Sequence, residues 1–296
     1  MKVIEINNLT KNYGEGKGIF NISFSIKKGE VFGFLGPNGS GKTTTIRNLM
    51  GFIKSDSGYC KINDLNSFKN SDEIQQNLGY IPGETSFFKD MTGIEFIKFI
   101  GNYRKLKSFD KAYELIKRFD LNQNTKIKKM SKGSKQKIAI IIAFMHNPEI
   151  LILDEATSGL DPIMQQEFIN LIKEEQSKGR TILMSSHIFG EIEKTCTKIG
   201  IIRNGKIISI IDINKLVKTR EKNFKITFKS KNDALEFTKN KLNILKIDEN
   251  TVEVKLTMNI NKFISLLSNY NIIDLEEIKQ NIEEKILKFY GGSNAK

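Results

Sequence analysis

Cysteine and long apolar stretches are both scarce in this sequence, and each shortage excludes a class of protein. The two cysteines, Cys60 and Cys196, lie far apart and belong to no CxxC or Cys/His cluster. This spacing argues against a structural zinc site and against a disulfide framework. The longest uninterrupted apolar stretch, Ile138 to Met145, is far shorter than the roughly 20 residues that span a bilayer. Any membrane association is therefore expected to come through another chain.

Acidic residues are also in short supply, because 34 Asp and Glu face 47 Lys and Arg, for a formal net charge of +13. This positive charge is compatible with binding to a nucleic acid or to an anionic membrane surface. It is also compatible with an organism whose proteins are generally rich in lysine. The lysines are spread along the chain without a recognised nucleic-acid module, which favours a solvated surface. The first ten residues alternate like a strand and lack the apolar core of a signal peptide. We expect a cytoplasmic protein with no nucleic-acid partner.

Three short apolar runs read as buried strands: Val31 to Leu35, Ile150 to Leu153 and Thr181 to Met184. Each is followed by a polar loop and a helical pattern, which predicts an α/β sheet. Between the first two runs, the apolar spacing from about residue 90 to 147 is mainly helical. The sequence therefore predicts one large domain over 1–213, with a helical subdomain inserted in its sheet.

The pattern changes after residue 213 and predicts a small α+β domain over 214–296. Strands are expected at 224–228, around 244 and at 252–256, and helices near 235, over 260–267 and over 278–287. No chemistry-bearing motif lies in this segment. A dimerisation element, a regulatory element and a spacer are all compatible with it.

The stretch GPNGSGKT, Gly36 to Thr43, fits the pattern GxxxxGK[ST] and lies between an apolar strand and a helical pattern. Its glycines allow backbone N–H groups to turn toward one centre, and the helix N-terminus adds partial positive charge. Lys42 is expected to neutralise β- and γ-phosphate oxygens, and the Thr43 hydroxyl to ligate Mg²⁺. The alternative is a glycine-rich turn without a ligand. The expected ATP contacts are Gly36, Pro37, Asn38, Gly39, Ser40, Gly41, Lys42, Thr43 and Thr44.

Polar side chains also follow the other two apolar runs: Asp154 and Glu155 after the second, and His187 after the third. Because the carboxyl ends of parallel strands meet at one ligand-binding edge, we expect them beside the phosphate loop. Asp154 is expected to orient a magnesium-bound water, and Glu155 to act as general base for the attacking water. His187 is expected to contact the γ-phosphate or position water. His146, at a predicted helix end where a cation complements the dipole, is interpreted as structural.

The alternative for the two acids is a strand leading into a helix N-terminus, where acidic residues are favoured. Three further segments bear on this choice. SKGSKQK stands at Ser131 to Lys137, LDEATSGLD at Leu153 to Asp161 and SSH at Ser185 to His187. With these segments in this order, the chain resembles an ABC transporter ATPase over about Met1 to Ile213.

The resemblance implies a P-loop NTPase core that hydrolyses ATP with Mg²⁺ and powers a separate membrane permease from the inner face of the cell membrane. It also implies a head-to-tail homodimer or heterodimer of ATPase subunits. The SKGSKQK form is similar to that of bacterial drug and antibiotic exporter ATPases, which points to an exporter. The C-terminal segment is similar to the accessory segment of that branch.

The resemblance assigns roles to the signature segment, Ser131 to Lys137, and to the SGLD loop, Ser158 to Asp161. Ser131 and Gly133 match the residues that contact the γ-phosphate bound by the opposite subunit, although Lys132 and Ser134 depart from the usual signature. A Ser that begins an apolar helix offers a hydroxyl and free N–H groups to an anion, but it is also an ordinary helix cap. Asp161 ends the loop that communicates between the two sites, and it also reads as a helix start.

Two more positions follow from the resemblance. Tyr13 matches the aromatic residue that stacks on adenine, the alternative being a turn aromatic packed on the first sheet. In GYIPGET, Gly83 occupies the place of the glutamine that usually reaches Mg²⁺ and senses the permease. Glu84 is the neighbouring candidate for a metal ligand.

Two other classes of function compete with a transporter subunit. A non-transport ABC ATPase that remodels nucleic acid or ribosomes is permitted by the basic charge. A single ATPase core, without a long heptad stretch between the phosphate loop and the signature, opposes it. A P-loop small-molecule kinase would need neither the signature nor the SGLD loop.

Overall fold

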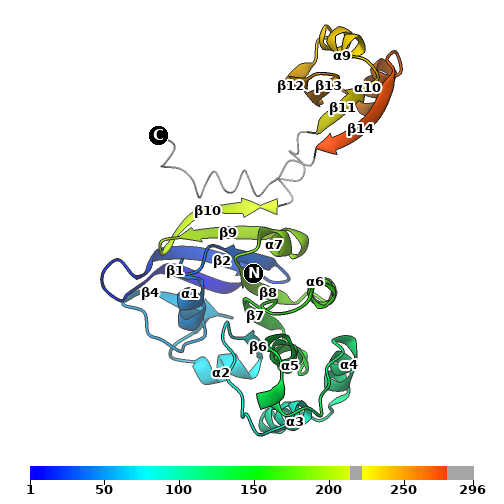
Figure 1. Ribbon diagram of the computed structural model, residues 1–296. Coiled ribbons are helices and arrows are strands. Elements are labelled where there is room, and N and C mark those ends of the chain that lie inside the picture. The colour runs from blue at the N-terminus through cyan, green and yellow to red at the C-terminus, as the bar shows by residue number, and fades with distance from the viewer. Residues whose placement is uncertain (214–221, 279–296) are drawn as a thin grey trace. The chain divides into compact units, whose positions relative to one another are not determined.

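The computed structural model describes residues 1–213 and 222–278. The chain divides into two compact units, Met1–Asn214 and Lys215–Lys296. Of the described sheets, two lie in the first unit and one in the second (Figure 1). Within the described residues, no helix is long and apolar enough to cross a membrane. Of the helix predicted over 278–287, only Ile278 is described, and it ends a strand. The remainder of that prediction lies outside the described residues.

A six-stranded sheet is the frame of the first unit. In spatial order its strands are β10 (Lys206–Asp212), β9 (Lys198–Arg203), β3 (Val31–Leu35), β8 (Thr181–Ser186), β7 (Ile150–Asp154) and β6 (Leu78–Ile81). All neighbouring pairs are parallel except β10 with β9. Every residue of β3, β7 and β8 is buried, as expected for parallel strands covered on both faces. The α/β fold predicted from the apolar runs is confirmed.

Helices connect and cover these strands (Figure 1). They are α1 (Lys42–Leu49), α2 (Ser71–Gln76), α3 (Gly93–Tyr103), α4 (Asp110–Arg118), the 3₁₀ helix η1 (Ile127–Lys129), α5 (Lys132–Phe144), α6 (Pro162–Ser177) and α7 (Phe189–Thr195). Helices α3, α4 and α5 lie between β6 and β7 in the chain, where the helical spacing places them. A capping box, in which the side chains of Thr92 and Glu95 each accept a backbone N–H, sets the start of α3.

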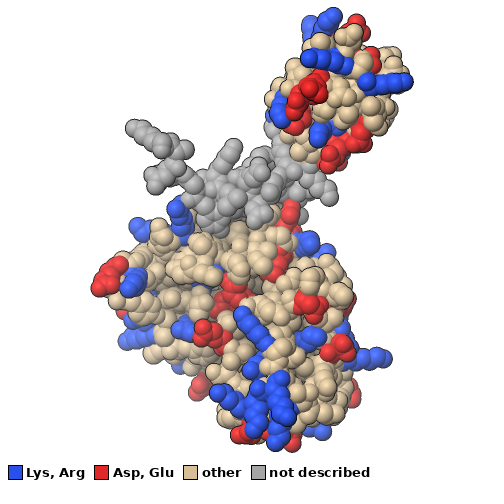
Figure 2. Space-filling view, in the orientation of Figure 1, with Lys and Arg blue, Asp and Glu red and all other residues tan. Residues whose placement is uncertain are grey.

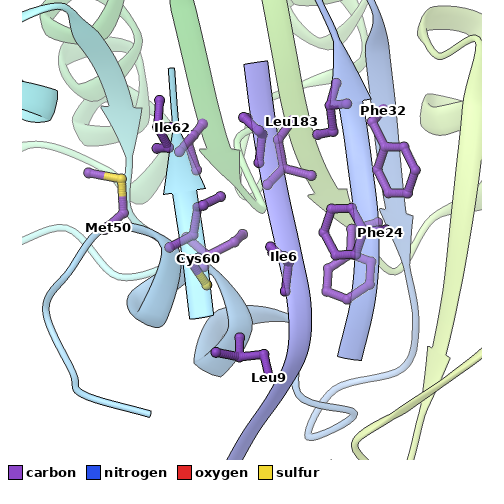
Figure 3. Packing of buried hydrophobic residues seen from close by; sticks show 14 of the residues in the cluster. Ile6, Leu9, Phe24, Phe32, Met50, Cys60, Ile62 and Leu183 are labelled. Atoms are coloured by element: carbon purple, nitrogen blue, oxygen red, sulfur yellow. The ribbon is translucent and has the colours of Figure 1, made fainter. Parts of the chain in front are cut away.

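A second, antiparallel sheet of the first unit packs its apolar side chains against α1 and the six-stranded sheet. Its strands, in spatial order, are β2 (Gly18–Lys27), β1 (Lys2–Asn12), β4 (Ser57–Ile62) and β5 (Leu65–Asn66). Figure 3 shows Phe24 of β2 beside Phe32 of β3, and their stacked rings are 4.8 Å apart. Ile46 and Leu49 of α1 belong to the same buried cluster. The helix that follows the phosphate loop therefore packs against residues of both sheets.

The surface of the first unit carries charges of both signs. Figure 2 shows Lys and Arg mixed with Asp and Glu over the face that it draws, with basic side chains gathered near α3 and η1. Lys128 of η1 is among the exposed lysines and pairs with Asp90 at 2.8 Å. On this face, charges of both signs are interspersed apart from that basic group.

The second unit has the order β-α-β-β-α-β. Its elements are β11 (Asn223–Phe228), α9 (Lys231–Thr238), β12 (Asn243–Asp248), β13 (Thr251–Lys255), α10 (Ile260–Leu267) and β14 (Ile272–Ile278). The antiparallel sheet has the order β12-β13-β11-β14, which is the ferredoxin-like arrangement. Phe224, Phe228, Phe237 and Phe263 fill its core. Strand β14 was not predicted, because this edge strand is largely exposed and shows no clear apolar alternation.

His146 lies just after α5, and its ring Nε2 is 3.2 Å from the Leu78 carbonyl oxygen. Burial, together with the nearby Arg104 charge, lowers the pKa of His146 to about 4. The residue is structural, but it is a neutral ring at pH 7 and not the cation that the helix end suggested. Because desolvation outweighs the helix dipole, the charged form is the costly one.

We expect the first unit to lose stability as the pH falls from 6.5 toward 4, because the unfolded state then binds a proton that folded His146 does not. Below pH 4 the full loss in the free energy of unfolding is about 3 kcal/mol, because the pKa of folded His146 is about 4 and that of an ordinary histidine is 6.5. Urea unfolding at several pH values measures it. His146→Gln, whose amide can still donate to Leu78, should show a shallower loss, and equal pH slopes for the two proteins would contradict the assignment.

Candidate active site

The phosphate loop joins the end of β3 to the start of α1. Its N-cap, Gly41, has a φ of 111° and offers no side chain to the first turn of the helix. A Cβ at this position would lie 2.6 Å from Ile19 Cγ2, so only glycine fits. The N-terminal N–H groups of α1 are therefore left for an external acceptor, as an anion site requires.

Lys42 directs its ammonium into this loop, with only 5% of the residue exposed. Its Nζ donates to the carbonyl oxygens of Gly36 at 2.7 Å and Pro37 at 3.2 Å, and lies 3.1 Å from Glu155 Oε1. A phosphate oxygen reaching the loop would therefore meet a cation that is held in place by the backbone. It would compete with Glu155 for that cation.

Glu155 follows β7 and lies between two partners. Its Oε2 is 2.7 Å from His187 Nδ1, on the loop after β8. The Glu155 backbone is in the left-handed region, with a φ of 50°, which costs roughly 1–2 kcal/mol for an L-residue. Its N–H donates to the Ser185 carbonyl oxygen and hydroxyl, each at 3.2 Å, and this holds the conformation. Strain of this kind persists where the surroundings fix a side chain for a task.

Asp154, the last residue of β7, is fully buried. Its Oδ1 accepts the Ser185 hydroxyl at 2.5 Å, whereas Oδ2 has no hydrogen-bond partner within residues 1–213 and 222–278. Burial raises the pKa of the Asp154 carboxyl, and the nearby hydroxyls of Ser185 and Thr43 oppose that rise. A buried carboxylate oxygen without a partner, beside the Thr43 hydroxyl, is the donor set that a hard cation prefers.

Residue 83 faces the same carboxylate. A Cβ on Gly83 would lie 3.1 Å from Asp154 Oδ2 and 3.8 Å from Thr43 Oγ1. Glu84, by contrast, is exposed. The backbone thus directs position 83 at the carboxylate, and the metal-ligand role of Glu84 stays a prediction.

The predicted convergence of the strand ends is observed. Strand β8 pairs with β3 on one side and β7 on the other, so the three loops that follow them are neighbours. Lys42, Glu155 and His187 are joined by the 3.1 Å and 2.7 Å contacts, although they are far apart in the sequence. Ser185, at the end of the buried run TILMSS, was not predicted to take part, and a polar residue closing an apolar strand was the available signal.

The signature segment lies against the SGLD loop of the same chain. Lys132 Nζ donates to Ser158 Oγ at 2.7 Å. A Cβ on Gly133 would lie 2.4 Å from the Gly159 carbonyl oxygen, so this close approach requires glycine. The Lys132 that departs from the usual signature is therefore accommodated by the loop beside it.

Both residues predicted as possible helix starts do cap helices. Ser131 precedes α5 and accepts the Ser134 N–H at 3.1 Å, and Asp161 precedes α6 and accepts the Met164 N–H at 2.9 Å. Ser131 remains exposed at the N-terminus of its helix. A capping role does not prevent Ser131 from meeting an anion there.

Tyr13 is 56% exposed, and Lys11 Nζ is 6.0 Å from its ring centroid. Much of the ring is therefore open to solvent, and its stacking on a base stays a prediction. An exposed aromatic face can accept a planar ligand.

Comparison with known proteins identifies the family. Residues 19–158 match the ABC transporter family model. The bacitracin transport ATP-binding protein BcrA of Bacillus licheniformis is 39% identical over 240 residues, which cover 79% of this chain and 77% of that protein. The linearmycin resistance ATP-binding protein LnrL of Bacillus subtilis (strain 168) is 36% identical, over 70% of this chain and 68% of that protein. The ABC transporter ATP-binding protein YhcH of the same strain is 30% identical, over 98% and 96%.

Solved structures agree in fold. An ATP-binding subunit of an ABC transporter superposes with a TM-score of 0.66 and 26% identity, covering 73% of this chain and 92% of that one. The dimeric ATP-binding cassette MJ0796, in a post-hydrolysis state bound to ADP and Pi, superposes with a TM-score of 0.64 and 22% identity, over 71% and 98%. The chain is therefore a member of the ABC transporter family, an ATP-binding and ATP-hydrolysing subunit.

Proposed function

We propose that two copies of this chain, or one copy with a related subunit, close head to tail on two ATP molecules and drive a separate permease that exports a drug or antibiotic. The observation that carries the hydrolytic part is the contact of Glu155 with both Lys42 and His187 at the edge of the sheet. The names of the bacitracin and linearmycin relatives support export of antibiotics. They favour transport over action on nucleic acid or ribosomes.

In this proposal the chain's own residues divide the work of hydrolysis. Lys42 neutralises charge on the β- and γ-phosphates. Glu155 accepts a proton as water attacks the γ-phosphorus, and the bond to the leaving ADP oxygen breaks. His187, held 2.7 Å from the Glu155 carboxylate, orients that base and reaches toward the γ-phosphate.

Thr43 and Asp154 fit a magnesium ion, because a hydroxyl lies beside a buried carboxylate oxygen that has no hydrogen-bond partner. A bound Mg²⁺ would supply positive charge that offsets the negative charge of the phosphate oxygens. We assign Glu84 as a further candidate ligand for the ion or for its water. The absence of a side chain at Gly83 leaves that side of Asp154 open.

The remaining residues would complete a composite site. Ser131 and Gly133, at the N-terminus of α5, would meet the γ-phosphate held by the partner subunit. The SGLD loop, ending at Asp161, would relay between the two sites. The exposed ring of Tyr13 would stack on adenine.

We further propose that the core over 1–213 works at the inner face of the cell membrane, through contact with the permease alone. The segment over 214–296 would act as an accessory domain. Its ferredoxin-like sheet and helices have a core of their own, which supports folding as a separate domain.

Co-expression with any multi-span membrane protein that an adjacent reading frame encodes tests the partner. We expect the two proteins to copurify, and bacitracin, used as a probe, to change the ATPase rate of the complex in vesicles. The matched control is the chain carrying Glu155→Gln, which should copurify without turnover. Recovery of the chain with RNA and without a membrane protein would instead support the nucleic-acid alternative.

A further inference from the structure

A buried carboxylate lies behind the catalytic pair without touching it. Glu191, in the first turn of α7, is 6% exposed. Its Oε1 accepts the Thr157 hydroxyl at 2.6 Å, and its Oε2 accepts the Ser186 hydroxyl at 2.7 Å. No cation pairs with it among the described residues. Both hydrogen bonds are short, so both oxygens are engaged.

The two hydroxyls belong to the two loops that present the catalytic pair. Thr157 stands two residues after Glu155, on the loop that follows β7. Ser186 stands directly before His187, and its hydroxyl also accepts the Ile188 N–H at 2.9 Å, which closes a turn around the histidine. One carboxylate therefore ties the base-bearing loop to the histidine-bearing loop.

The helix that carries Glu191, α7, is packed into the core of the first unit. Ile192, the next residue of α7, is fully buried, and the helix packs against β3 and β8. On its other side, the base-bearing loop is held by Gln136 of α5, whose Nε2 donates to the Ala156 carbonyl oxygen at 2.7 Å. The contact between Glu155 and His187 is partly solvent-exposed at the His187 ring, so it depends on these buried supports behind it.

We propose that Glu191 is a positioning residue for ATP hydrolysis. By accepting both hydroxyls, it holds the loops after β7 and β8 at the separation that keeps Glu155 within hydrogen-bond distance of His187. The Glu191 carboxylate hydrogen-bonds neither the phosphate loop nor Asp154, so its loss should slow the chemical step without weakening nucleotide binding. This inference rests on the proposed roles of Glu155 and His187.

Glu191→Gln tests the proposal, because the amide keeps the size of the side chain but accepts only one of the two hydroxyls. We expect kcat to fall about 10- to 100-fold, the usual effect of removing a supporting partner. The dissociation constant for ATP with Mg²⁺ should not change. Thr157→Val should have the same effect, and Thr157→Ser, which keeps the hydroxyl, should retain the wild-type kcat.

A double variant tests whether Glu191 and Thr157 affect kcat through the same contact or independently. If the hydroxyl and the carboxylate act as one tie, Glu191→Gln combined with Thr157→Val should lose no more kcat than the more severe single variant. Fully multiplicative losses would overturn the proposal. If Glu191→Gln does not fold, Thr157→Val alone decides, and a wild-type kcat in it would equally overturn the proposal.

Glu175→Gln is the matched control. Glu175 is also a buried carboxylate, 3% exposed, but it lies on α6 and pairs with Lys178 and Arg180. The Glu175→Gln variant should be less stable than the wild-type protein but should have the wild-type kcat. Equal loss of kcat in both variants would reduce Glu191 to a structural residue. A wild-type kcat in Glu191→Gln, when Glu155→Gln is inactive, would overturn this inference and leave the proposed function intact.

Discussion

Glu155→Gln should abolish steady ATP turnover while ATP binding persists. The amide keeps the length of the side chain and its place beside Lys42 and His187, but it cannot accept the proton of the attacking water. Loss of a positioned general base typically lowers the rate about 10²- to 10⁴-fold. Phosphate release under saturating ATP and Mg²⁺ measures the effect. Near-normal turnover would remove Glu155 from the role of base.

The same variant should expose the composite dimer. Because hydrolysis is blocked, two copies closed on ATP should persist, and size-exclusion chromatography with and without ATP and Mg²⁺ detects them. Adding Gly133→Ala should prevent this dimer, since the new Cβ would lie 2.4 Å from the Gly159 carbonyl oxygen and displace the signature segment. A protein that stays monomeric in saturating ATP would count against the head-to-tail arrangement.

Lys42→Ala should weaken ATP binding and hydrolysis together. The variant removes the cation that the loop carbonyls hold at the phosphate position, and it leaves Glu155 without its ammonium partner. Removing one preorganised charge or donor of this kind costs about 10²- to 10³-fold in kcat. Calorimetric titration with ATP gives the binding loss, and phosphate release gives the rate.

Lys54→Ala is the control for the lost charge, because Lys54 is an exposed lysine outside the phosphate loop. It should bind and hydrolyse ATP like the wild-type protein. If Lys42→Ala matched this control, the buried ammonium would not be the phosphate partner, and the loop would hold the nucleotide through backbone N–H groups alone.

Much of the site could be predicted from the sequence because its parts are continuous. The phosphate loop is one run of residues whose turn and helix start follow from local backbone preferences. The apolar runs before Asp154 and before His187 predict buried strands. In a parallel sheet, the carboxyl ends of the strands lie at the same edge of the sheet. Those local signals were sufficient to predict that Lys42, Glu155 and His187 meet.

Other features depend on residues that no local pattern relates. The sequence does not show that Asp154 Oδ2 lacks a partner, that Gly83 faces it, or that Lys132 reaches Ser158. Glu191 reads as an ordinary acid in the first turn of a helix. Edge strand β14 has too little buried surface to produce an alternating pattern.

The sequence by itself therefore determined the phosphate loop, the α/β class and the strand ends where the chemistry lies. Backbone geometry within a few residues is sufficient for each of these. Only the tertiary structure decided which side chains hold the loops of Glu155 and His187 in place. The order of β3, β8 and β7 brings together loops that are far apart in the chain. Contacts of this kind arise from packing, and packing depends on all the elements at once.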